Sequence, residues 1–94
     1  MSTQGEKVMS DKISIKQVLR VFDVITRHGQ HYDNEYHLDG LSANAGFDGY
    51  TITLHNQHSR LTVFFHNTFS FDYPNQKAYE YFLSQLNTID KAHY

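Results

Sequence analysis

The sequence has no cysteine and no tryptophan, and proline occurs once. Without cysteine, the chain has no disulfide bonds, no thiolate metal ligands and no cysteine nucleophile, and its composition suits a reducing compartment. Lysine and arginine are also scarce, at eight of 94 residues, and they do not cluster. Because binding to a nucleic-acid backbone depends on concentrated positive charge, we expect no nucleic-acid partner.

Long hydrophobic runs are missing as well. No segment approaches the ~20 consecutive apolar residues that cross a bilayer, and the polar residues 1–12 lack the apolar region of a signal peptide. We therefore expect a cytoplasmic protein with no membrane partner. The length suits one hydrophobic core. We predict a flexible N-terminal leader over 1–12, a single α+β domain over 13–90 and a C-terminal tail over 91–94.

What the chain does contain is seven Phe and seven Tyr, many of them in alternating patterns. Segments 50–55 and 60–65 each place apolar residues at every second position, and a polar break at 56–59 separates them. This pattern predicts two half-buried strands of a hairpin. If His55 lies opposite Arg60, the apolar side chains of both strands form one continuous face.

A third alternating run, at 69–73, extends this sheet. A two-residue turn would send its aromatic residues to the opposite face. We therefore predict a three-residue loop over 66–68, which places Phe65 beside Phe69.

The segment before these strands contains further turn and strand signals. Asp33 and Asn34 predict a turn within a polar connection. In segment 36–43 the alternation changes phase at Gly40. A β-bulge at this glycine would keep the apolar residues on both sides of it facing the core, and we predict one strand with that bulge.

Asp48 and Gly49 form the strongest short hairpin signal in the chain, and they would pair Phe47 with Tyr50. Together these segments predict four antiparallel strands that follow one another as a meander.

A helix is predicted on each side of the strands. Segment 15–28 has the period of an amphipathic helix, with Ser14 as its N-cap, Gln17 completing a capping box and Gly29 available for a left-handed C-cap. Asn75 caps a second helix after Pro74 ends the sheet. Its inward residues are predicted to be Tyr79, Phe82, Leu83, Leu86 and Ile89, and its outward residues Glu80, Ser84, Gln85 and Asn87. The predicted fold is α+β, in the order helix, four-stranded antiparallel meander, helix (α-β-β-β-β-α), with both helices packed on one face of the sheet.

Catalytic motifs are missing from this sequence. It contains no nucleophile elbow, no phosphate-binding P-loop and no dinucleotide-binding glycine motif. The seven histidines include two pairs with a two-residue gap, at His28 and His31 and at His55 and His58, but solvated surface histidines explain this spacing better than a metal site. Asp48 and Asp72 are explained by turn and strand positions. We predict no enzymatic activity, no catalytic residue, no metal ligand and no cofactor.

The face of the sheet opposite the core carries the most informative residue, Phe64. The surrounding side chains are predicted to be Thr53, Thr62, His55 and His66, so that an aromatic residue lies inside a polar rim. Protein interfaces favour this arrangement. We therefore predict a non-catalytic interaction or self-association module that uses the open sheet face. Its partner would be a second copy in a two-fold homodimer, or an unidentified protein.

A second hypothesis is that the protein binds a small molecule or a metal ion. Its pocket would be lined by His37, His55 and His66 together with tyrosines, because imidazoles are good ligands for zinc. The sequence leaves both hypotheses open.

Four segments together resemble a known family. They are VFDVITRHG (21–29), DGYTITL (48–54), LTVFFHN (61–67) and FDYPN (71–75). With them, the chain is similar to a small bacterial domain family of unknown function, across roughly residues 14–86. The resemblance implies a short stand-alone cytoplasmic protein, and it supplies no activity, cofactor or catalytic residue.

Overall fold

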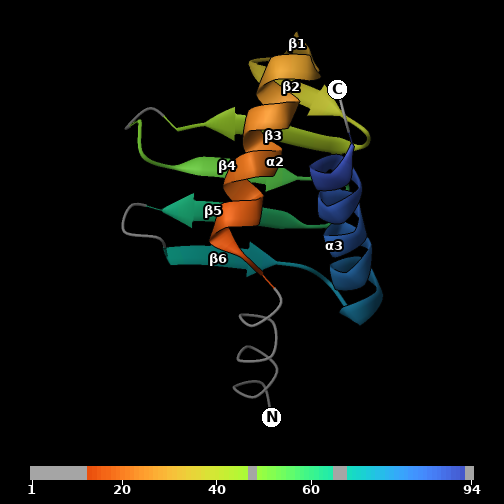
Figure 1. The fold of residues 1–94 in the computed structure, drawn as a ribbon. Helices are drawn as coiled ribbons and strands as arrows, with labels where there is room; N and C mark the ends of the chain where they lie inside the picture. Colours follow the sequence, from red (N-terminus) through yellow and green to blue (C-terminus); the bar gives the residue numbers. More distant parts are fainter. Residues whose placement is uncertain (1–12, 47–48, 65–67, 93–94) are drawn as a thin grey trace.

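The structure is a computed structural model that describes residues 13–46, 49–64 and 68–92. Over these residues the protein is α+β, with a helix, a six-stranded antiparallel sheet and a second helix (Figure 1). The predictions for the leader, for Phe47, Asp48 and Phe65, and for His66 lie outside the described residues. The elements are α2 (Ile15–His28), β1 (Gln30–Tyr32), β2 (Glu35–Leu38), β3 (Leu41–Ala45), β4 (Ile52–His55), β5 (Arg60–Phe64), β6 (Thr68–Asp72) and α3 (Gln76–Lys91).

The prediction of a four-stranded meander is wrong. The described strands are neighbours in the order β1-β2-β3-β4-β5-β6, so the sheet is a meander, but it has six strands. The predicted bulged strand over 36–43 is instead two strands, β2 and β3, joined by a tight turn. The polar connection before it forms the remaining strand, β1.

Two turns with positive φ angles account for this difference. Asp39 and Gly40 have φ values of 51° and 85°, and Asp33 and Asn34 have 54° and 63°. Positive φ at both central residues is typical of the type I′ turn, whose twist matches that of a two-residue β-hairpin. The predicted bulge at Gly40 is therefore a chain reversal. It still leaves the apolar residues facing the core, because Leu38 pairs with Leu41.

Strand β1 lacks the alternation of apolar and polar residues that marks a half-buried strand. All three of its residues are exposed. It pairs with β2 and forms one edge of the sheet. A short polar edge strand limits edge-to-edge pairing between molecules. The same polar composition makes the strand look like a loop in the sequence.

The predicted register between β4 and β5 is confirmed, and the predicted register between β5 and β6 is wrong. His55 pairs with Arg60, as predicted, and Ile52 pairs with Val63. In the final hairpin Phe69 pairs with Val63, not with Phe65, so β6 is shifted by two residues from the predicted position. Because side chains alternate with a period of two, this shift keeps the β6 aromatic residues on the predicted face.

Helix α2 has the predicted bounds and the predicted N-cap, but its capping box and its left-handed C-cap are not formed. The Ser14 side chain accepts a hydrogen bond from the Gln17 backbone N–H at 3.3 Å, as an N-cap should. The Gln17 side chain points to α3 instead of completing a capping box with Ser14, and its Nε2 donates to Asn87 Oδ1 at 2.6 Å. Gly29 has a φ of −80°, so the predicted left-handed cap is wrong, and the chain passes directly into β1.

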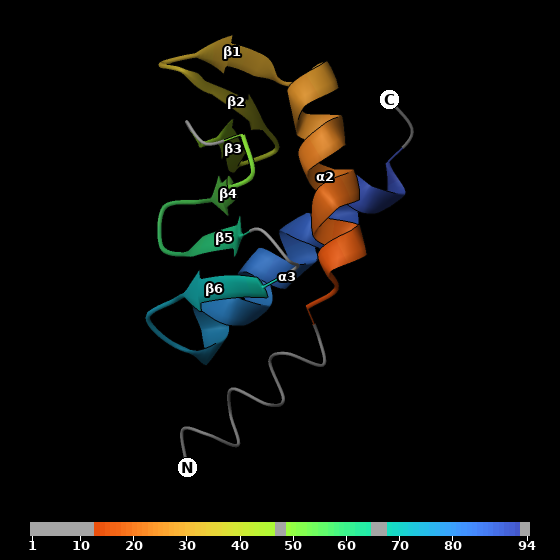
Figure 2. The same cartoon turned by 90° about the vertical axis from the view of Figure 1, so that its left-hand side faces the viewer.

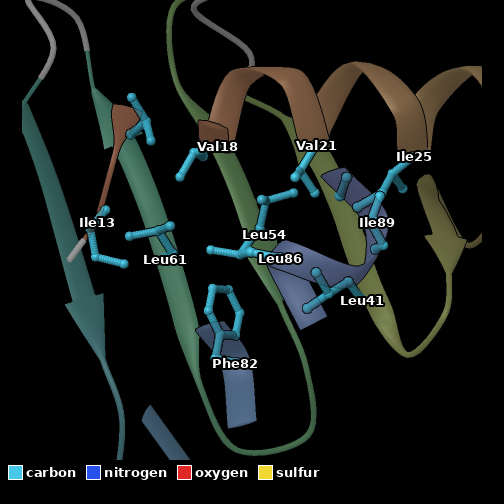
Figure 3. Packing of buried hydrophobic residues seen from close by; sticks show 12 residues of the cluster. Ile13, Val18, Val21, Ile25, Leu41, Leu54, Leu61, Phe82, Leu86 and Ile89 are labelled. Atoms are coloured by element: carbon cyan, nitrogen blue, oxygen red, sulfur yellow. The ribbon is translucent and has the colours of Figure 1, made fainter. Parts of the chain in front are cut away.

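Helices α2 and α3 cover the same face of the sheet (Figure 2). Figure 3 shows their apolar residues packed with those of the strands; Val18 and Val21 come from α2, and Leu54 and Leu61 come from the sheet. Arg20 of α2 also forms two hydrogen bonds of 2.9 Å to Asp90 of α3. Within the described residues, neither helix is long and apolar enough to cross a bilayer. The buried core consists of Ile13, Val18, Val21, Ile25, Leu41, Ala43, Leu54, Leu61, Val63, Phe82, Leu86 and Ile89.

Candidate interaction surface on the open sheet face

The sheet face opposite α2 and α3 is covered by neither helix (Figure 2). We call it the open face. Strand alternation and register place polar residues on it in rows that cross several strands. The described members of the open face are Gln30, Tyr32, Glu35, His37, Ser42, Asn44, Thr53, His55, Arg60, Thr62, Phe64, Thr68, Ser70 and Asp72.

The structure brings together only part of the predicted site. Thr53 and Thr62 are direct cross-strand partners at the centre of the face, and Thr53 is only 9% exposed. Phe64 follows on β5 and remains 41% exposed. His55 pairs with Arg60, four residues from Phe64 along β5 and therefore about 13 Å away. His55 does not flank Phe64, and His66 lies outside the described residues.

A network around Glu35 was missed by the sequence analysis. One oxygen of the Glu35 carboxylate, Oε2, accepts a hydrogen bond from Asn44 Nδ2 at 2.7 Å and lies 2.9 Å from His55 Nε2. The His55 and Glu35 side chains are only 21% and 24% exposed. The network joins β2, β3 and β4, and it fixes three open-face side chains. Its sequence signals were two turns. Asp33-Asn34 pairs Glu35 with Tyr32, and Asp39-Gly40 sets the β2–β3 register that brings Glu35 near Asn44.

The hydrogen bond from His55 lowers the pKa of Glu35 below its ordinary value, and the hydrogen bond from Asn44 acts in the same direction. Partial burial opposes this effect, since it disfavours the charged carboxylate. Because the folded state holds Glu35 ionised more strongly than the unfolded state does, the charged carboxylate stabilises the fold above the ordinary glutamate pKa. This contribution is lost as pH falls through the lowered pKa.

We expect Glu35→Gln to reduce the free energy of unfolding by about 1 kcal/mol at pH 7, since it removes charge from two hydrogen bonds. The difference from wild type should shrink as pH falls below the ordinary glutamate pKa and through the lowered pKa of Glu35 in the folded state, where the native carboxylate is also protonated. Urea unfolding at pH 7 and at pH 3 measures this change. Glu80→Gln on the surface of α3 is the matched control and should have a smaller effect. An equal loss at both pH values would contradict the assignment.

His37 forms a second set of contacts on the open face. Its Nε2 lies 3.2 Å from the Tyr32 backbone oxygen and its Nδ1 lies 2.8 Å from Ser42 Oγ. A carbonyl oxygen can only accept, so Nε2 carries the hydrogen, and in a neutral ring Nδ1 accepts from the Ser42 hydroxyl. The ring also stacks on Tyr32, with centroids 4.0 Å apart. These contacts anchor β1 to the sheet.

The arrangement gives little support to the metal hypothesis. His37 and His55 form separate contacts, with Ser42 and Tyr32 and with Glu35 respectively. In segments 13–46, 49–64 and 68–92, no group of three or more His, Cys, Asp or Glu side chains could hold a metal ion.

Comparison with protein families gives a match over residues 13–94, to a model described as a protein of unknown function, DUF3081. The chain belongs to the DUF3081 family. This confirms the resemblance to a domain family of unknown function. No curated protein and no solved structure matched the chain.

Proposed function

We propose that this DUF3081 protein is a non-catalytic, cytoplasmic self-association module that forms a two-fold dimer through its open face. One observation carries the proposal. Phe64 is 41% exposed on a sheet face that neither α2 nor α3 covers, and its register places it beside the polar residues Thr62 and Thr68. Exposed aromatic residues inside a polar rim are characteristic of interface cores.

The rigidity of the open face supports the proposal. Thr53 and Thr62 are β-branched, so their side chains lose little conformational freedom on binding. Glu35 and His37 are already fixed by hydrogen bonds. Ordering side chains in advance reduces the entropy lost on association.

The charge of the open face also suits a second copy of the chain. Arg60 and Asp72 are cross-strand partners of opposite sign, and Glu35 accepts a hydrogen bond from Asn44. Opposite charges on one surface allow a two-fold arrangement without large like-charge repulsion.

The size of the face predicts a weak dimer. Six strands of about five residues form a surface of about 24 by 16 Å, or ~400 Å² in projection per protomer. Stable interfaces bury about 800 Å² per partner. We therefore expect a dimer whose population depends on protein concentration.

Phe64→Glu should make the protein monomeric and leave it folded, because it places a charge where the two faces meet. Sedimentation equilibrium at several protein concentrations measures the association, and circular dichroism checks the fold. Leu19→Glu is the matched control. Leu19 is 45% exposed on α2, on the far side of the sheet, so this variant should dimerise like wild type.

Two results would overturn the proposal. One is a wild-type protein that stays monomeric at every concentration. The other is a Phe64→Glu variant that associates as strongly as wild type, which would place the contact elsewhere on the surface.

A further inference from the structure

A cavity of about 620 Å³ lies at one end of the sheet, and none of its lining residues is among the open-face residues named above. The β2–β3 turn, the β4–β5 loop and the β6–α3 connection form its walls together with α3, and these segments lie at the same end of the molecule (Figure 1). Its volume is within the range of small-molecule sites. The lining residues are Gly40, Asn56, Gln57, His58, Pro74, Asn75, Lys77, Ala78, Tyr81 and Gln85.

One side of the cavity is fixed by Gln85, a residue predicted to face solvent but only 9% exposed. Its Oε1 accepts a hydrogen bond from Asn56 Nδ2 at 2.7 Å, and its Nε2 donates to the Asp39 backbone oxygen at 3.4 Å. A Cβ atom at Gly40 would lie 2.7 Å from that same Nε2. Glycine at this turn therefore lets Gln85 approach, and α3 is tied to two loops of the sheet.

The β4–β5 loop forms another wall and is ordered by Asn56. The Oδ1 atom of Asn56 accepts hydrogen bonds from the backbone N–H groups of His58 and Ser59, at 2.9 and 2.8 Å. The Asn56 N–H donates to the Ser59 backbone oxygen at 3.0 Å. This turn holds His58 beside the cavity without using its imidazole.

The charge on the cavity lining is positive. Lys77 is its one residue with a fixed charge, no lining residue is an aspartate or glutamate, and His58 adds an imidazole. Within the described segments, Lys77 takes part in none of the ion pairs. The nearby Glu80 carboxylate accepts a hydrogen bond from Gln76 and is not part of the lining. The cavity thus offers a ligand an ammonium group that is in none of the described ion pairs.

The rest of the lining suits a flat, partly apolar molecule. Tyr81 is 57% exposed, and Pro74 and Ala78 add apolar surface beside it. A tyrosine ring of this kind offers a stacking surface for a planar group. Gln57 provides an amide that can donate or accept hydrogen bonds, and the second Nδ2 hydrogen of Asn56 can donate.

We infer that this cavity binds a small organic anion, namely a carboxylate or phosphate group attached to a planar ring. Lys77 pairs with the anionic group, Tyr81 contacts the ring, and the amides at the cavity wall orient it. Placing one charged contact and a few polar groups in a largely apolar pocket is the usual design of small-ligand sites. The site is separate from the proposed dimer face, so either can fail while the other holds.

Amide NMR titration of the full chain tests the inference, with phenyl phosphate and benzoate as probes and phenol as the uncharged comparison. Both anions should cause saturable shifts at the His58, Lys77 and Ala78 amides, and phenol should bind more weakly. Lys77→Ala should weaken phenyl phosphate binding by about tenfold, because it removes a charge-assisted contact. Lys77→Arg should restore most of the affinity.

Lys91→Ala is the matched control, because Lys91 is at the other end of α3 and should not affect binding. Three outcomes overturn the inference. They are the lack of saturable shifts with either anion, equal binding of phenol, and unchanged affinity in Lys77→Ala. The unliganded amide spectrum of each variant shows that it is folded, so a loss of binding can be assigned to the site.

Discussion

Replacing Phe82 with alanine should lower the free energy of unfolding by about 3–5 kcal/mol. Phe82 is fully buried on α3, and its ring lies 5.0 Å from that of Phe71 on β6. Figure 3 places it close to Leu61 of the sheet and Leu86 of α3. The substitution removes the aromatic contacts and leaves a cavity that neighbouring strands and helices fill only in part.

Urea unfolding followed by circular dichroism measures this loss. The matched control is Tyr81→Ala, one position earlier on α3, where the ring is 57% exposed. It should cost less than about 1 kcal/mol, since most of this side chain is already in water. Similar losses for both variants would show that α3 does not dock through the face that contains Phe82.

The second large effect is expected at Gly29, the residue between α2 and β1. Gly29→Ala should cost about 2–3 kcal/mol, as overpacking of a tight contact does. Backbone strain is not the cause, because the φ angle of −80° is open to any residue. A Cβ atom here would lie 2.6 Å from the His37 backbone oxygen on β2 and 2.6 Å from that of Ile25. Neither backbone oxygen can move without displacing the helix or the strand.

Gly49 provides the comparison for this prediction. It has a φ of 79°, and a Cβ atom there would meet nothing within 4 Å. Gly49→Ala should therefore cost only the left-handed backbone penalty of about 1–2 kcal/mol. Thermal unfolding of both variants separates the two causes. A greater loss at Gly49 than at Gly29 would show that β2 does not approach the end of α2 this closely.

The helices and the central hairpin could be predicted because their signals are local. The period of α2, its Ser14 cap and the His55–Arg60 register all follow from neighbouring residues. The Asp39-Gly40 turn has the same Asp-Gly signal as Asp48-Gly49, but the phase change at Gly40 was interpreted as a bulge. Either structure returns the apolar residues to the core, so alternation alone could not distinguish them.

The missed features depend on contacts between distant segments. Gln85 is buried because Asn56 and the Asp39 carbonyl, from two separate loops, satisfy its amide. A glutamine on a helix gives no sign in the sequence of such partners. Glu35 became part of the open face only because β1 and β2 form a hairpin, and the polar β1 lacks the apolar alternation that identifies a strand.

The placement of α2 and α3 on either side of the strands in the sequence has a consequence for synthesis on the ribosome. Each strand pairs with its immediate predecessor, so the sheet can assemble stepwise as the chain emerges. One of the two helices that cover the sheet, α3, is synthesised after all six strands. It supplies the core residues Phe82, Leu86 and Ile89. Until α3 emerges, a nascent chain exposes Leu61 and other apolar residues that α3 later covers. We expect this interval to be when the chain is most prone to aggregate and most in need of a chaperone.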